Sequence, residues 1–200
     1  MLTYKDLPLY EMTLGDTDGV QIMSIVNNPA IQIGFLKFNN DVIKQKFSYD
    51  EDKRIITGAA MVPELPIYRV IDGFECYVKF SADTIKQLAE KFMLEGRTLS
   101  VNIEHCLPTN ECVITETYFI NHERNIVPEE FKDLPDGTWM ISMKVNDDAI
   151  WDAIKTNGLN GFSIEGIFQL DTNNFNSVVP EEIVTNENFL DWLYKQFMEN

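Results

Sequence analysis

Apolar and polar residues alternate along most of the chain, and this pattern predicts a protein built mainly of short strands. The apolar runs are rich in Val, Ile, Phe and Tyr and are separated by Gly, Pro, Asn and Asp, as is typical of strands joined by turns. The pair Asp72-Gly73 interrupts one of these runs and predicts a hairpin there. The predicted strands cover residues 53–62, 66–80, 98–105, 111–120, 137–145 and 161–170.

Apolar residues spaced three or four positions apart predict helices between and after these strands. Ser81 is expected to cap the first helix and Gly96 to end it, because a hydroxyl accepts from free N–H groups and glycine readily leaves the helical conformation. Asn146 is expected to cap the second helix and Gly158 to end it. The predicted helices cover residues 81–96, 146–158 and 187–200. The apolar face of the first consists of Ile85, Leu88, Ala89 and Phe92.

Many short strands with few helices predict an α+β domain with a curled or closed antiparallel sheet. Surface connections are predicted at residues 39–52 and at the Asn-rich stretch 171–182. We divide the chain into one domain, residues 1–172, followed by residues 173–200 as a polar linker and an amphipathic helix. The apolar stripe of that helix is expected to pack on the domain; the alternative is that it docks on another protein or on a second copy.

Composition excludes several classes of protein. A chain of 200 residues with 44% hydrophobic and 12% aromatic residues is typical of one globular domain. The net charge of -16 argues against sequence-independent binding to nucleic acid, which requires clustered Lys and Arg. Three cysteines form no disulfide framework, and an odd number is typical of a reducing compartment. The chain has neither a signal peptide at its start nor an apolar run long enough for a membrane span, so we expect an intracellular protein.

A histidine and a serine, residue types suitable for nucleophilic catalysis, occur at a predicted strand end and in a glycine-flanked strand. His105 ends a predicted strand, where Pro108 is expected to interrupt the pairing, and Ser163 lies in a later strand between Gly161 and Gly166. An imidazole that removes the proton of a serine hydroxyl is a common nucleophile and base pair. The flanking glycines fit a site where a substrate backbone approaches and backbone N–H groups bind an oxyanion. The alternative explanation is a bulge at which the sheet bends.

Other chemistries are less compatible with the same region. The side chains of His105, Cys106, Cys112 and His122 suggest zinc ligands, but neighbouring residues of a strand point to opposite faces and no C-x-x-C pair is present. Cys106 faces away from His105 for the same reason, which argues against a thiol nucleophile. His122 lies in a polar run and is interpreted as a loop residue. We expect neither a metal nor an organic cofactor.

Five stretches occur in order between about residue 20 and residue 170: IMSIVNNPAIQIGFLKF, RIITGAAMVPELPIYRV, YVKFSADTIKQLAEKF, VNIEH and GTWMISMKVNDDAIWDAIKTNGLNGFSIEG. Together they resemble successive blocks of the XkdF-type phage serine proteases, relatives of the prohead proteases of tailed phages. That family is similar in turn to the herpesvirus assemblins. The resemblance implies a small, mostly antiparallel β-barrel ringed by helices, with His105 as general base and Ser163 as nucleophile.

The third catalytic residue departs from the assemblin pattern. Assemblins use a second histidine after the serine, and this chain has none after Ser163. Glu116 is our preferred replacement, because the strand that follows His105 can return beneath the imidazole. Glu165 and Asp171 are alternatives, as is a dyad without a third member. Glu165 shares a face with Ser163 by strand alternation.

The resemblance implies a serine endopeptidase that cleaves scaffold protein, extensions of the capsid protein and itself during assembly of a phage head. Its partners are then the major capsid protein and the scaffold protein, with a homodimer as a further candidate. The enzyme is expected in the host cytoplasm, inside the assembling prohead. The alternative is a non-catalytic structural or scaffold-interacting protein that keeps the fold.

Overall fold

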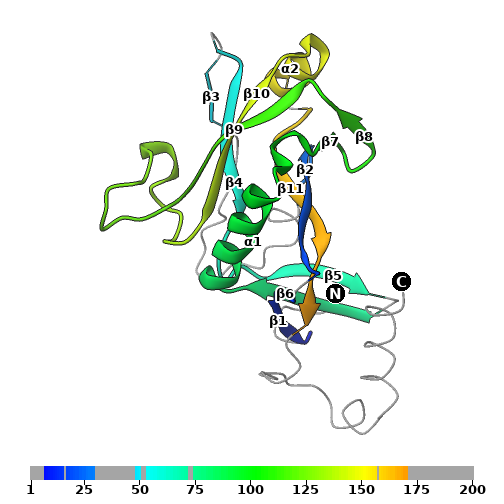
Figure 1. Cartoon of the computed structure of the whole chain (residues 1–200), viewed down its shortest axis with the longest axis vertical. Helices are drawn as coiled ribbons and strands as arrows, with labels where there is room; N and C mark the ends of the chain where they lie inside the picture. Colours follow the sequence, from blue (N-terminus) through cyan, green and yellow to red (C-terminus); the bar gives the residue numbers. More distant parts are fainter. Residues whose placement is uncertain are drawn as a thin grey trace, which may run out of the picture.

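The computed structural model is an α+β structure with mostly strands and, in the part of the chain described, two α-helices (Figure 1). The description covers residues 7–15, 17–29, 48–50, 53–71, 74–156 and 158–170. The strands are β1 Leu9–Thr13, β2 Gly19–Val26, β3 Ser48–Asp50, β4 Ile55–Met61, β5 Ile67–Ile71, β6 Phe74–Phe80, β7 Val101–Ile103, β8 Leu107–Thr109, β9 Cys112–Phe119, β10 Trp139–Val145, β11 Gly161–Ile167 and β12 Gln169–Leu170. The helices are α1 Ala82–Leu94 and α2 Asp148–Lys155, with short 3-10 turns at Arg97–Leu99 and Glu129–Phe131.

The strands form three four-stranded sheets, ordered β12-β1-β6-β5, β3-β4-β10-β9 and β11-β2-β7-β8. Seven of the nine strand pairs in the described residues are antiparallel, and the pairs β1–β6 and β2–β7 are parallel. The mostly antiparallel α+β architecture is therefore confirmed. The three sheets, as described, are not closed into a barrel, so the barrel stays a prediction.

Helix α1 has the predicted boundaries because its signals are local in sequence. The Ser81 hydroxyl accepts from the Thr84 N–H, and Gly96 adopts a left-handed φ of 68° just beyond the last turn. The predicted apolar face is the buried one, and Phe92 packs edge-to-face on Trp139 of β10 with ring centroids 5.6 Å apart. Each fully buried side chain of this size stabilises the fold by about 1.5–3 kcal/mol. This helix lies between the sheets and packs into the main core (Figure 1).

Several predicted boundaries are wrong. The strand predicted at 98–105 is only β7, because Arg97–Leu99 form a 3-10 turn and residues 104–106, His105 among them, form a turn. The cap of α2 is Asp147, whose carboxylate accepts from the Ile150 N–H at 2.8 Å, whereas Asn146 donates its backbone N–H to Glu111. The expected surface connection 39–52 contains β3, which pairs with β4. The single strand predicted at 161–170 is two strands in different sheets, β11 and β12.

The antiparallel pairing of β5 with β6 confirms the predicted hairpin, although Asp72 and Gly73 themselves lie outside the described residues. Asp171 and the linker and helix predicted at 173–200 also lie outside the described residues. The division of the chain into a domain and a C-terminal part therefore stays a prediction. Within the described part of the chain, neither helix has the length and apolar character needed to cross a membrane.

Candidate functional site

A line of buried polar side chains crosses the sheet β11-β2-β7-β8. Ser163 of β11 pairs with Ser24 of β2, and Ser24 pairs in turn with Asn102 of β7. Their exposed fractions are 6%, 0% and 5%. Residues directly opposite each other on paired strands point to the same face of the sheet, so these three side chains share one face.

His105 lies at the edge of this face, in the turn that joins β7 to β8. His105 and Glu104 both have left-handed backbones, with φ of 57° and 52°. Such conformations cost about 1–3 kcal/mol for residues other than glycine, and they persist where neighbouring contacts hold them. Here the Glu104 N–H donates to the Ile25 carbonyl, and its carboxylate accepts from the Asn27 N–H at 2.6 Å. The turn that carries His105 is thus attached to β2.

The expectation that Pro108 interrupts the pairing after His105 is wrong. Pro108 pairs with Asn102 within the short β7–β8 hairpin. Strand β8 is the outermost strand of its sheet in the described residues, and an edge strand tolerates proline because its outward side needs no N–H donor.

The His105 imidazole contacts a carboxylate and a hydroxyl at the same nitrogen. Its Nδ1 lies 3.0 Å from Oε1 of Glu165 and 2.9 Å from Oγ of Ser24. The same Oε1 accepts from the Ser24 hydroxyl at 2.8 Å and from Nδ2 of Asn102 at 2.5 Å. The His105 and Glu165 side chains are 42% and 34% exposed, so solvent reaches the site from one side.

These contacts determine the protonation state of the pair. Burial alone raises the pKa of the Glu165 carboxyl, but the hydrogen bonds from Asn102, His105 and Ser24 and the charge of His105 together lower it below its usual value. An ionised carboxylate only accepts hydrogen bonds, so the proton shared with His105 belongs to Nδ1. The lone pair of the neutral imidazole is then on Nε2, as in a general base oriented by a carboxylate.

Ser163 occupies the strand position next to this cluster. Directly paired residues have Cβ atoms about 4.5–5.5 Å apart, so Ser163 lies one strand spacing from Ser24, which contacts His105. In the described residues, no hydrogen bond joins the Ser163 side chain to His105. The two predicted residues therefore each adjoin Ser24, one as its strand partner and the other as its hydrogen-bond partner.

The glycines that flank Ser163 have packing explanations. A Cβ atom on Gly161 would lie 2.7 Å from a ring carbon of Pro29, and one on Gly166 would lie 2.3 Å from the Gly19 carbonyl oxygen. The β11–β2 register also shifts between Glu165 and Gly166. The bulge explanation therefore accounts for Gly166, and an oxyanion site is not needed to explain either glycine.

Glu116, the preferred third residue, lies on β9 in a different sheet. Its carboxylate accepts from the Ser142 hydroxyl at 2.7 Å, and Ser142 is also 2.9 Å from the Thr57 hydroxyl. Glu116 lines an open pocket together with Tyr118, whose pKa is raised by burial and by nearby carboxylates. The structure thus places Glu165, not Glu116, against His105.

The residues considered as zinc ligands lie in separate surroundings. Cys112 is fully buried, and burial raises the pKa of its thiol to about 12, whereas Cys106 is exposed. His122 is in a turn and contacts Asp136. No group of three or more His, Cys, Asp or Glu side chains is arranged to hold a metal ion in the residues that the structure describes.

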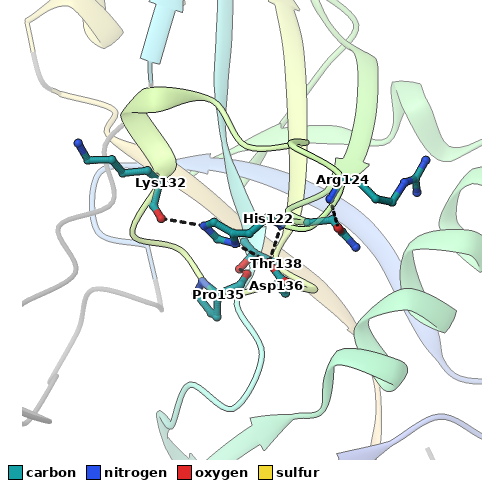
Figure 2. Close-up of polar contacts among 7 residues, drawn as sticks. His122, Arg124, Lys132, Pro135, Asp136 and Thr138 are labelled. Carbon is teal, nitrogen blue, oxygen red and sulfur yellow. Dashed lines mark hydrogen bonds and ion pairs between the residues drawn. The ribbon is translucent and has the colours of Figure 1, made fainter.

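His122 fastens the segment between β9 and β10, which extends away from the sheets in Figure 1. Its Nδ1 lies 2.5 Å from a carboxylate oxygen of Asp136, and its Nε2 lies 3.0 Å from the Lys132 carbonyl (Figure 2). The backbone N–H of His122 donates to the same Asp136 oxygen at 2.9 Å. The same segment contributes Ile120, Phe131 and Leu134 to a separate small core, whose other members are Ala59, Val62 and Met140.

Asp136→Asn is expected to lower the melting temperature more at about pH 5 than at about pH 8. The pKa of His122 is raised above 6.5, mainly by the hydrogen bond to Asp136, so its contribution is complete below pH 6.5 and is lost as the pH rises through the raised value. The pKa of Asp136 is lowered below 3.8, mainly by the His122 ring, so its contribution is lost only as the pH falls through that lower value. Asp133→Asn, at an exposed carboxylate of the same segment, is the control for thermal unfolding at both pH values. Equal losses at the two pH values would contradict the ion pair.

Two residues of the cluster, Ser24 and Asn102, were missed by the sequence interpretation. The available signal was a single polar residue within an apolar run, in IMSIV and in VNI. Buried strands rarely place a polar side chain in such a run unless it has a partner.

A family model described as "Putative phage serine protease XkdF" matches residues 42–171. The match covers 130 of the 200 residues and includes His105, Ser163 and Glu165, whereas Ser24 precedes it. No curated protein and no solved structure matches the chain significantly.

Proposed function

The chain belongs to the XkdF family of phage serine proteases, and from this premise we propose that it is a serine endopeptidase of phage head maturation. The observation that carries the proposal is the contact between His105 Nδ1 and the ionised Glu165, beside Ser163. A carboxylate, an imidazole and a neighbouring serine hydroxyl are the groups that acyl transfer requires.

Each residue has a distinct role in this proposal. Ser163 attacks the scissile carbonyl, and Nε2 of His105 removes the hydroxyl proton and later delivers it to the leaving amine. Glu165 orients the imidazole and stabilises its charged form, and therefore replaces Glu116 as the third member. Nucleophile and base are commonly too far apart in enzymes without substrate, and they approach when substrate binds.

Strand β11 supports the binding of a peptide substrate. In the described sheet it is an outer strand, hydrogen-bonded to β2. In an antiparallel pair, alternate residues direct their N–H groups away from the partner. Such groups near Ser163 are candidates for binding the oxyanion or for pairing with an extended substrate.

The proposed substrates are scaffold protein, extensions of the major capsid protein and the chain itself, inside the assembling head in the host cytoplasm. The second candidate function is a non-catalytic capsid-assembly protein. One observation favours it: His105 Nδ1 contacts Ser24 and Glu165, whereas Ser163 is not hydrogen-bonded to His105 in the described residues.

Co-expression with the major capsid and scaffold proteins of the same phage tests the proposal. We expect shortened products, whose new termini are identified by mass spectrometry. If the chain is folded and enters heads while these proteins stay full-length, the non-catalytic alternative is supported and the endopeptidase is contradicted.

A further inference from the structure

Ser24 is placed to connect His105 and Glu165. Its Oγ lies 2.9 Å from Nδ1 of His105 and 2.8 Å from Oε1 of Glu165, and the residue is fully buried. A hydroxyl has one proton to donate. Because ionised Glu165 only accepts, the Ser24 proton points to Glu165, and the Ser24 oxygen shares the Nδ1–H of His105 with Oε1 of Glu165 in a bifurcated hydrogen bond.

This geometry also distinguishes Ser24 from a nucleophile. Its proton is directed to the carboxylate of Glu165, and its side chain is fully buried. Ser163, at 6% exposed and directly opposite on β11, lacks such a hydrogen bond to Glu165 in the described residues.

Asn102 holds the same carboxylate from the other neighbouring strand. Its Nδ2 donates to Oε1 of Glu165 at 2.5 Å, and this contact determines which way the amide points. Its Oδ1 is consequently buried without a hydrogen-bond partner in the described residues. A buried amide oxygen without a partner destabilises a fold, so the amide is explained by its donor rather than by packing.

We propose that Ser24 and Asn102 are positioning residues for the proposed catalytic pair, a statement that rests on the function proposed above. Together they hold Glu165 at one place and ionised, and Ser24 also accepts the Nδ1 proton of His105. The imidazole is thereby held in the Nδ1–H tautomer, with the lone pair on Nε2. The hydrogen bond at one ring nitrogen decides which nitrogen is free to act as base.

The tautomer of His105 is measurable independently of catalysis. The chain has two histidines, so the 15N spectrum of histidine-labelled protein contains two imidazoles, and His122→Gln assigns them. In its neutral form, His105 of the wild type is expected to show a protonated Nδ1 and a free Nε2. In Ser24→Ala and in Asn102→Leu, we expect a mixture of tautomers.

The same variants are expected to lower kcat by about 10- to 100-fold with little change in KM, because a misplaced imidazole affects the chemical step. Ser24→Thr keeps the hydroxyl and should restore both the tautomer and most of kcat. Ser142→Ala is a matched control, since Ser142 is also buried and donates to a glutamate, Glu116, in another sheet. Ser142→Ala should change neither the tautomer of His105 nor kcat.

The outcomes separate this inference from the proposed function. If folded Ser24→Ala and Asn102→Leu keep the wild-type tautomer of His105, the positioning role is wrong, whether or not the chain is a protease. If the tautomer changes in these variants while the wild type cleaves nothing, the positioning role is supported and the proposed function is contradicted. Asn102→Leu replaces a side chain of similar size, so it serves if Ser24→Ala does not fold.

Discussion

Ser163→Ala and His105→Ala are each expected to abolish processing of the co-expressed capsid and scaffold proteins. Removing the nucleophile or the base of such a unit lowers kcat by about 10⁴-fold or more. The two residues act in one step, so the double variant should be no worse than either single variant. Cleavage is read from gels and from mass spectra of assembled heads.

The folded structure should tolerate both changes. Ser163→Ala removes only one hydroxyl, which forms no hydrogen bond with His105 in the described residues. The His105 side chain is 42% exposed, so its removal leaves little buried space. Circular dichroism and thermal unfolding should therefore resemble the wild type, with Ser142→Ala as a control at another buried serine. Wild-type processing by either site variant would remove that residue from the mechanism.

Glu165→Gln is expected to impair cleavage by about 10⁴-fold, whereas Glu116→Gln should remain close to wild type. A glutamine at residue 165 can direct its NH₂ group to Nδ1 and thus favour the wrong tautomer of His105, as happens when the carboxylate of a triad is replaced by its amide. Glu116 contacts Ser142 in another sheet, so its amide variant should affect the Thr57 and Ser142 network instead.

This pair of variants is compared by kcat and KM on a purified peptide substrate. Although burial raises the pKa of Glu165, the hydrogen bonds from Asn102, His105 and Ser24 lower it below its usual value, so its carboxylate is ionised at the neutral pH of this comparison. A larger effect of Glu116→Gln would instead identify Glu116 as the third catalytic residue. Equally small effects of both changes would indicate a dyad.

Local signals in the sequence predicted most of the secondary structure. The prediction of helix α1 is confirmed because its cap, apolar face and terminal glycine lie within 16 residues of one another. The cap of α2 was misplaced by one residue, because Asn146 and Asp147 are both good caps and the choice depends on the contact of Asn146 with Glu111.

The site depended on information that is not local. The contact of His105 with Glu165 joins residues 60 positions apart, and it requires the β11–β2–β7 register, which alternation of apolar residues does not determine. Glu116 was preferred because a hairpin was expected between the strand that ends at His105 and the strand that carries Glu116. Instead β7 pairs with the short β8, and β9 pairs with β10.

The most direct test of a serine nucleophile at residue 163 is labelling with a fluorophosphonate, followed by peptide mapping. The probe reacts with a serine hydroxyl that a neighbouring base activates, and it does not require knowledge of the natural substrate. The proposed mechanism predicts one adduct at Ser163, which disappears in His105→Ala and is strongly reduced in Glu165→Gln. An adduct at Ser24, or no adduct on folded protein under conditions of head assembly, would contradict the assignment of Ser163 as the nucleophile.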